Sequence, residues 1–527
     1  MKITKYIKFG FFSTALVITG MSCTKLLDIP PQNKLSFDEF WKSRDQAVAA
    51  IAGVYSNLGS TRWDFKNGNQ SNLGVSPVEC YVYWGDMRGE ILSTNPGKLP
   101  AIQIDKENID AYIPTANDNL TRYTAFYKII NEANQAIKNI PGIMDKDPAF
   151  TSTEETQLMG EAYFLRAYAY FWLVRTFKEV PLVLNPSEND QQDYDVPKAS
   201  ADTLFKQIVA DLTLAKKTLP VWYTNDQYNR VRATQYTAST VLADVYLWIA
   251  STGKDKTLNS GYYDKAIANC DAVINSSKYF LLPGVNFADI WMIGNTEEAI
   301  FETYSNSLLN NQVNNLKDWF NTKPYFVVNG ATDVLFSNEV LPDYRGSGTL
   351  VPPGPYPPAG TKVSYNETTR AVLKYNSSTN DARWNFYRYP DVLLMKAEAL
   401  AHRYVDDPSK LKIASDLVDQ VRQRAFGVST FTKLAVSSTT EMDDALLDER
   451  GREFIGEGRR WFDLVRFASR DNFAHKELLT GRVLGAFGGV TQLIISPRIT
   501  NPESWYLPLN GLALSSNPKL VQNPYYQ

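Results

Sequence analysis

The chain has 527 residues, of which 44% are hydrophobic, 21% are charged and 13% are aromatic. This composition is that of a globular protein with a large core, in one large domain or a few smaller ones. The formal net charge is −3 and no run of Lys or Arg occurs, which excludes a basic surface for nucleic acid.

Residues 1–22 have the pattern of an export signal. Three lysines precede a short apolar segment at residues 9–21 (FGFFSTALVITGM), and small Ser22 comes directly before Cys23. The apolar segment is shorter than the roughly 20 residues that span a bilayer. A Cys at this position predicts a bacterial lipoprotein that is cleaved before Cys23 and acylated there, anchored to a membrane by its lipid. Residues 20–22 depart from the usual Leu-Ala-Gly, so cleavage nearby in a soluble secreted protein remains the alternative.

Apolar residues recur at spacings of three and four over much of the chain, the period of a helix with one face on a core. Such stripes fall within residues 48–58, 123–137, 158–172, 205–219, 241–248, 263–274, 392–399 and 411–425. No strand pattern separates neighbouring helices, which predicts antiparallel pairs stacked in a solenoid-like, tetratricopeptide-like array. The predicted fold class is therefore mainly α.

The helical period vanishes in two long segments, residues 61–117 and 281–382, which are rich in Gly, Pro, Asn and aromatic residues. We expect residues 23–527 to form a single domain in which these two insertions are loop-rich. The helical scaffold would occupy about 36–60, 118–280 and 383–470. Loops that a rigid framework positions are where binding is expected.

Metal and cofactor chemistry have little support in the sequence. Only Cys80 and Cys270 follow Cys23, and without a CxxC pair neither a zinc site nor a disulfide framework is predicted, although pairing of these two stays open. The two histidines, His402 and His475, lie in no recognisable motif. No twelve-residue calcium loop is present. We therefore predict no cofactor and no metal, with a calcium ion held by loop Asp and Asn residues left open.

The most highly charged stretch is residues 448–467, DERGREFIGEGRRWFDLVRF. Glu449, Glu453 and Glu457 step by four and would share one face of a helix. One interpretation is a surface glycoside hydrolase with Glu449 and Glu453 as acid and base. The other, which we favour, is a helix held in the fold by ion pairs, because residues on one helix face point the same way and do not face each other across a sugar. Three glycines in the stretch favour close helix packing: Gly451, Gly456 and Gly458.

Five blocks of the sequence carry a family resemblance. They are residues 27–31 (LDIPP) with Phe40-Trp41 and Gly53-Val54-Tyr55; residues 161–171 (EAYFLRAYAYF) with 180–183 (VPLV); residues 388–395 (RYPDVLLM) with 397–400 (AEAL); residues 449–464; and Asn517-Pro518 with residues 522–526 (QNPYY). In this order behind a lipoprotein signal, the blocks resemble the SusD/RagB family, the surface nutrient-binding lipoproteins of Bacteroidetes. Tyr525 stands where a Gly is usual in the family.

The resemblance implies a helical scaffold of tetratricopeptide-like pairs and no enzymatic activity. It implies anchorage at the outer membrane, facing the cell exterior, and a partner, a TonB-dependent transporter of the SusC type over which such proteins sit as a lid. Family ligands are commonly oligosaccharides, though other nutrients occur. A pure protein-interaction scaffold of the tetratricopeptide type is a weaker alternative, because the two insertions are expected to cover one face.

Ligand contacts are expected in the two insertions, because the resemblance places them there without fixing individual residues. Sugar recognition uses flat aromatic faces for C–H groups and polar side chains for hydroxyls. For each ring the alternative is packing beneath a loop, and the alternation of Tyr81 and Tyr83 suggests a short strand. The predicted ligand-binding residues are Trp63, Asn69, Tyr81, Tyr83, Trp84, Asp86 and Arg88 in the first insertion, and Trp319, Phe320 and Tyr325 in the second.

Overall fold

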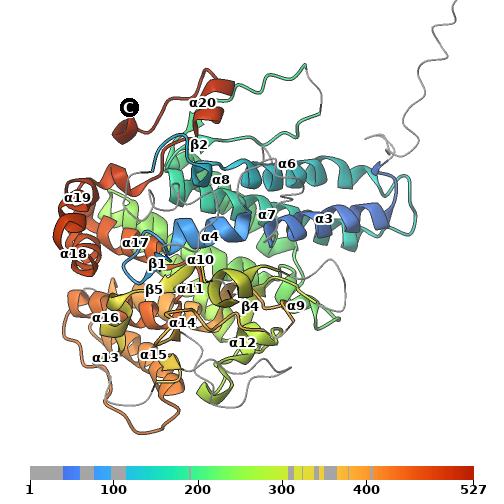
Figure 1. The fold of residues 1–527 in the computed structure, drawn as a ribbon. Helices are drawn as coiled ribbons and strands as arrows, with labels where there is room; N and C mark the ends of the chain where they lie inside the picture. Colours follow the sequence, from blue (N-terminus) through green and yellow to red (C-terminus); the bar gives the residue numbers. More distant parts are fainter. Residues whose placement is uncertain are drawn as a thin grey trace, which may run out of the picture.

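The computed structural model of the chain describes residues 40–59, 76–95, 114–188, 191–306, 314–322, 324–337, 343–348, 365–377, 379–403 and 407–527. The export signal and the proposed acylation site Cys23 lie outside these residues. The described part of the chain is mainly helical, as the apolar period predicts (Figure 1). Among its helices, none is both long enough and apolar enough for a membrane span.

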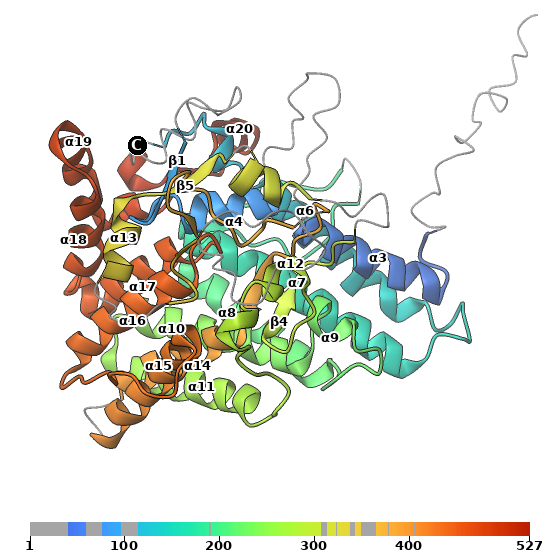
Figure 2. The ribbon, with the colours of Figure 1, turned by 60° about the horizontal axis from the view of Figure 1, so that its bottom comes forward.

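The scaffold is a stack of helices in which each packs against the next along the chain (Figures 1 and 2). In order, the stack consists of α6 (Thr124–Asn139), α7 (Ser152–Phe177), α8 (Ala201–Thr218), α10 (Gln235–Thr252), α11 (Lys256–Ile274), α14 (Tyr389–Ala401) and α15 (Ser409–Phe426). A further helix, α3 (Arg44–Leu58), packs against α6 and α7. The predicted tetratricopeptide-like stack of helices is confirmed.

Local sequence signals start and end these helices. The hydroxyl of Thr151 accepts from the Glu154 amide at 3.3 Å, and the Glu154 carboxylate accepts from the Thr151 amide at 3.1 Å, which forms a capping box at the start of α7. Helix α15 ends at Gly427, whose φ of 66° lies in the left-handed region that glycine adopts without strain. Ala162 and Ala243 are fully buried, so small side chains allow neighbouring helices to approach closely.

The helical scaffold continues beyond residue 470, where the sequence pattern predicted its end. Helix α17 packs against α10, near the middle of the stack, and α16, α18 and α19 follow one another at the C-terminal side (Figure 2). The C-terminal helices are α16 (Thr439–Glu453), α17 (Arg460–Phe473, with a kink at Arg470, Asp471 and Asn472), α18 (Glu477–Ala486), α19 (Gly489–Ile499) and α20 (Gly511–Ser516).

The first insertion contains a helix that the sequence pattern did not predict, α4 (Pro77–Gly85). The expectation of a short strand at Tyr81 and Tyr83 is therefore wrong. Ser76 caps the helix by accepting from the Glu79 amide at 3.3 Å, and Pro77 occupies its first turn. Nearly all of its side chains are buried, so α4 has no polar face and no amphipathic period that would reveal it.

Short strands pair within and near the insertions. Three of the ribbons are antiparallel: β1 (Leu92–Thr94) with β5 (Phe326–Val328), β2 (Val180–Pro181) with β3 (Lys198–Ala199), and β4 (Ala299–Glu302) with β8 (Asn385–Arg388); β6 (Ser347–Gly348) and β7 (Tyr365–Asn366) are parallel. Of these pairs, β2 with β3 joins the ends of the segment between α7 and α8. The remaining short helices are η3 (Asn119–Thr121), η4 (Ile140–Gly142), α9 (Tyr228–Val231), η5 (Gly284–Asn286), α12 (Asp289–Met292), η6 (Asp318–Thr322), α13 (Gly330–Ser337), η8 (Pro502–Trp505) and η9 (Pro524–Tyr526).

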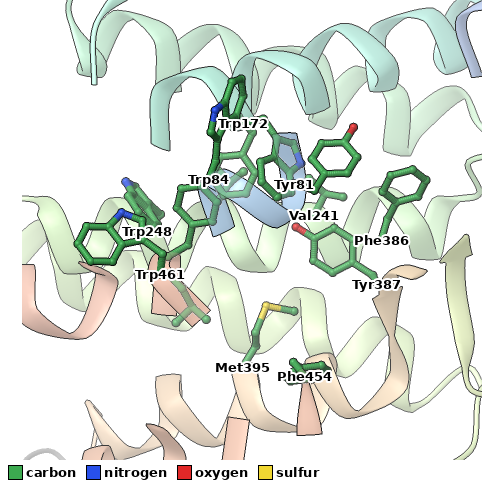
Figure 3. Packing of buried hydrophobic residues seen from close by; sticks show 14 of the residues in the cluster. Tyr81, Trp84, Trp172, Val241, Trp248, Phe386, Tyr387, Met395, Phe454 and Trp461 are labelled. Atoms are coloured by element: carbon green, nitrogen blue, oxygen red, sulfur yellow. The ribbon is translucent and has the colours of Figure 1, made fainter. Parts of the chain in front are cut away.

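The core contains many aromatic side chains among its aliphatic residues (Figure 3). Trp84, Trp248 and Trp461 are each almost fully buried, and the three come from helices far apart in the sequence, α4, α10 and α17. One large cluster of buried residues unites the stack with both insertions. A smaller cluster lies where α3 and η4 meet the first half of α7.

Candidate ligand-binding site

The charged stretch at residues 448–467 forms two helices and a turn, so the prediction of a single helix is wrong. Helix α16 ends at Glu453 and α17 begins at Arg460. Between them Gly456 and Gly458 have φ values of 74° and 72°, a left-handed conformation that interrupts a helix. Glu457 therefore lies in the turn and does not share a helix face with Glu449.

Glu453 is the centre of a buried ion-pair network. One of its carboxylate oxygens accepts from Arg388 at 2.9 Å and from Arg424 at 2.5 Å, and the other accepts from Arg345 at 2.9 Å. The neighbouring glutamates are paired likewise: Glu449 with Arg345 at 2.6 Å and Arg452 at 2.9 Å, and Glu457 with Lys374 at 2.5 Å and Arg388 at 2.9 Å. The ion-pair interpretation of this stretch is confirmed.

The hydrolase alternative at Glu449 and Glu453 is contradicted by the structure. Both side chains are 0% exposed, so neither reaches a substrate. Burial alone raises the pKa of Glu453, but the surrounding cations Arg424, Arg388 and Arg345 outweigh it and hold the pKa well below the ordinary value. A general acid in glycoside hydrolysis needs the opposite shift, a raised pKa.

Three predicted ligand-binding rings of the first insertion lie in the core. Tyr81, Tyr83 and Trp84 project from α4 and are almost fully buried. The ring of Tyr81 lies 4.3 Å from that of Trp172 on α7 between centroids, and Figure 3 shows both rings in the central cluster with Trp84. These rings pack the scaffold and have no surface for a ligand. Two other predicted residues, Trp63 and Asn69, lie outside the described residues.

Asp86 and Arg88 are also structural. The carboxylate of Asp86 accepts from the backbone amides of Gly458 at 2.7 Å, Arg459 at 3.0 Å and Arg460 at 3.1 Å, and so caps α17. Burial raises the pKa of Asp86 to about 7, although these three amides oppose the shift. Arg88 is buried and donates to the carbonyls of Trp505 and Ser504, each at 2.6 Å.

Of the three predicted ligand-binding residues in the second insertion, only Tyr325 is more than marginally exposed. Phe320 is fully buried, with its ring 5.2 Å from Phe326 and 4.8 Å from Tyr375. Trp319 is 8% exposed. Tyr325 is partly exposed, and its backbone amide donates to the Trp319 carbonyl at 2.7 Å. The position of Tyr325 fits a ligand contact, whereas Trp319 and Phe320 support it from below.

The two insertions meet at the β1–β5 ribbon. Leu92 lies opposite Val328, and the pairing continues past the strands, where Asn95 donates from its backbone to Tyr325 O at 2.9 Å and from its side chain to Pro324 O at 2.9 Å. Alternate residues of the ribbon are buried, and the others form what we call the outer face of the ribbon: Ser93, Asn95, Tyr325, Val327 and Asn329. An aromatic ring and three small polar side chains thus share one surface.

Arg370 fixes the far edge of this surface. Its guanidinium donates to the carbonyls of Val328 at 3.2 Å and Asn329 at 2.6 Å, and to the Asp333 carboxylate at 3.0 Å. The φ of Arg370 is 62°, a left-handed conformation that is uncommon for a side-chain-bearing residue and costs free energy. The surrounding hydrogen bonds offset this cost, which gives the outer face a rigid border.

Tyr304 is a candidate that sequence reasoning missed. It lies two residues after the end of β4, within the second insertion, and is 42% exposed. The guanidinium of Arg383 lies 4.9 Å from its ring centroid, and the side chain of Asn306 donates to its hydroxyl at 3.3 Å. The sequence signal that could have identified Tyr304 is an aromatic residue near the point where an apolar strand ends and a polar segment begins.

These surfaces have the chemistry of sugar binding and no metal chemistry. One exposed and one partly exposed tyrosine ring, with amide, hydroxyl and guanidinium neighbours, suit the apolar faces and hydroxyls of a saccharide. The described residues contain no group of three or more His, Cys, Asp or Glu that is placed to hold a metal ion. Cys80 and Cys270 are buried and unpaired, which answers the question that the sequence left open.

Comparison with known proteins gives one family. A model of the SusD family matches residues 355–526, and a model described as starch-binding associating with outer membrane matches residues 90–247. The SusD-like protein P38 of Formosa agariphila is 25% identical over 564 aligned residues, which cover 100% of both chains.

Solved structures show the same fold. A SusD superfamily protein from Bacteroides vulgatus superposes with a TM-score of 0.69 at 19% identity, covering 92% of this chain and 99% of its own. Surface glycan-binding protein A from Bacteroides uniformis superposes with a TM-score of 0.69 at 22% identity, covering 91% and 99%. Together with the two family models and the full-length relative, these likenesses agree with the resemblance seen in the sequence blocks: the chain belongs to the SusD family.

Proposed function

We propose that this protein binds a nutrient glycan at the cell surface and delivers it to a TonB-dependent transporter of the SusC type. The observation that carries the proposal is the β1–β5 ribbon, which joins both insertions of a SusD-family scaffold into one surface with a partly exposed tyrosine and polar neighbours. The names of its relatives, which include a surface glycan-binding protein, and the starch-binding description of the matching family model support a saccharide ligand.

The protein acts at the outer membrane and faces the exterior, held by lipid on Cys23. The family description, with its association with the outer membrane, supports the location, and the export signal followed by Cys23 supports the anchor. It has no catalytic role in this proposal: the glutamates nearest to a hydrolase pattern are buried in ion pairs, and binding requires only a preformed surface.

The ligand contacts proposed are Tyr325 on the outer face of the ribbon and Tyr304, which follows β4 elsewhere in the second insertion. Asn95 and Asn329 offer amide groups for sugar hydroxyls, and Arg383 holds the ring of Tyr304. Trp63 and Asn69 of the first insertion stay in the proposal as sequence-based candidates. The buried rings of α4 contribute indirectly, because they fix the helix from which β1 continues.

A glycan-binding screen of the mature chain from Thr24 onward tests the proposal. We expect binding of at least one oligosaccharide, and a loss of tenfold or more in affinity for Tyr325→Ala, since a stacked aromatic ring contributes about 1.5 kcal/mol or more to binding. Tyr194→Ala is the matched control, because Tyr194 is 48% exposed and lies in neither insertion. Calorimetry measures the affinities.

Two results would count against the proposal. One is equal binding by Tyr325→Ala and by the control, which would place the ligand elsewhere. The other is release of shorter sugars when the purified protein is incubated with the bound oligosaccharide, because such turnover would make the protein an enzyme.

A further inference from the structure

A pocket lies far from the β1–β5 ribbon, between the first turns of α7 and the end of α8. It has a volume of about 270 Å³. Its lining carries hydroxyl and amide groups and no charged side chain: Ser152, Thr153, Thr156, Gln157, Thr218 and Pro220. The volume is close to the lower end of known ligand pockets, about 300 Å³, and large enough for one sugar ring.

An exposed aromatic ring is connected to this pocket through a chain of side-chain contacts. Gln157 of the lining donates to Glu161 at 3.4 Å, and the fully buried Glu161 carboxylate accepts from Arg232 at 2.9 Å. The guanidinium of Arg232 lies 5.2 Å from the ring centroid of Tyr228, which is 41% exposed. A continuous chain of contacts therefore fixes Tyr228 relative to the pocket.

The chemistry of the pocket favours a neutral saccharide over an anion. The lining has no charged side chain to bind an anion, and Glu155 in the first turn of α7 adds negative charge nearby, whereas Glu154 is paired with Arg44 at 2.6 Å. Hydroxyl and amide groups both donate and accept, which matches the hydroxyls of a sugar. The ring of Tyr228 offers an apolar face for the C–H groups of a further sugar unit.

The pocket and the β1–β5 ribbon lie at opposite ends of α7. The last residue of α7, Phe177, has its ring 5.4 Å from Trp84 on α4, and β1 follows α4 closely in the chain. The 26 residues of α7 span about 39 Å at 1.5 Å per residue. Both Figure 1 and Figure 2 place α9, which carries Tyr228, well away from β1 and β5.

From these observations we infer that the α7–α8 pocket with Tyr228 is a second binding site, which takes a ring of a neutral glycan. The inference rests on the proposed function and adds a second point of attachment to it. A long glycan that occupies both sites gains effective concentration at the second site once it is held at the first, whereas a short oligosaccharide does not.

Calorimetry on the mature chain tests the inference, with neutral hexasaccharides of gluco, xylo, manno and galacto configuration as probes. We expect two molecules of one probe to bind per chain. Tyr228→Ala removes the ring, and Thr156→Trp fills the pocket. Each variant should weaken binding at the α7–α8 pocket at least tenfold and leave binding at the β1–β5 ribbon unchanged. Tyr325→Ala should do the converse, and Tyr194→Ala should change neither site.

The outcomes separate the two proposals. If one molecule binds per chain and only Tyr325→Ala weakens it, the second site does not exist while the proposed function stands. If no probe binds, both proposals fall. Circular dichroism checks that each variant is folded. If the larger side chain of Thr156→Trp disturbs α7, the effect of Tyr228→Ala alone decides whether the second site exists.

Discussion

At the scale of single residues, Asp86 shows how one carboxylate joins distant parts of the chain. It follows α4 and accepts from three amides at the start of α17, more than 370 residues later. The contact is tight because two glycines face each other there: a Cβ on Gly85 would collide with the backbone of Gly458, and one on Gly458 would lie 2.7 Å from the Tyr81 carbonyl. Residues predicted to bind ligand thus lock the scaffold.

Asp86 also gives a prediction about pH. Because burial raises its pKa from the ordinary 3.8 to about 7, its contribution to stability is full below pH 4 and is lost as the pH rises toward 7. Asp86→Asn does not titrate. The difference in unfolding free energy between the wild type and this variant should therefore shrink from pH 4 to pH 7, by up to about 1.4 kcal/mol per pH unit.

Urea unfolding of the two proteins across this pH range measures the difference. The other titrating groups are the same in both proteins, so their contributions to the unfolding free energy cancel. A difference that grows with pH would show that the three amides stabilise the charged carboxylate more than burial destabilises it.

At the scale of elements, α16 contributes both buried and exposed ion pairs, which allows a matched test. Glu453 is fully buried among Arg345, Arg388 and Arg424. Asp448, on the same helix, pairs with Arg482 at 2.5 Å, but its side chain is 40% exposed. A buried pair that loses one partner leaves charges without solvent or counter-ion, whereas water replaces an exposed partner.

We therefore predict that Glu453→Gln lowers the free energy of unfolding by about 3–5 kcal/mol. Asp448→Asn should lower it by no more than about 1 kcal/mol. Urea titration followed by circular dichroism gives both values. Similar effects of the two substitutions would mean that the network around Glu453 does not hold the α16–α17 corner together.

At the scale of the whole molecule, a rigid helical stack carries two insertions that meet on one surface. Both ends of this surface are tied down, since β1 pairs with β5 and Arg370 binds the carbonyls that follow β5. Such a scaffold presents a preformed ligand surface, so little ordering is needed on binding. Tethering by lipid at Cys23 would hold this surface at the membrane where a transporter lies.

The tether leads to a prediction for the intact protein in its cell. Cys23→Ala should abolish incorporation of labelled palmitate and move the protein from the outer-membrane fraction to soluble fractions, because two or more acyl chains supply the membrane affinity. Glycan binding by the purified mature chain should be unchanged. Continued labelling of the variant would place the lipid on another residue.

Much of the fold could be predicted from the sequence, because local and periodic patterns specify it. The stripes at residues 158–172 and 411–425 mark α7 and α15, since an apolar face must recur every three or four residues to reach a core. The sequence blocks likewise indicate the family. Helix α4 escaped prediction because it is buried on nearly all sides and so has no polar face to create a period.

The candidate site was predictable only in outline. From the sequence we could predict a mainly helical scaffold and expect ligand contacts in its two insertions. The packing of the folded chain was needed to show that Tyr325 is partly exposed while Tyr81 and Trp84 lie in the core, and that Glu453 pairs with three arginines. The physical reason is that exposure and ion pairing depend on which segments pack together, and these contacts join residues tens to hundreds of positions apart, which local spacing does not encode.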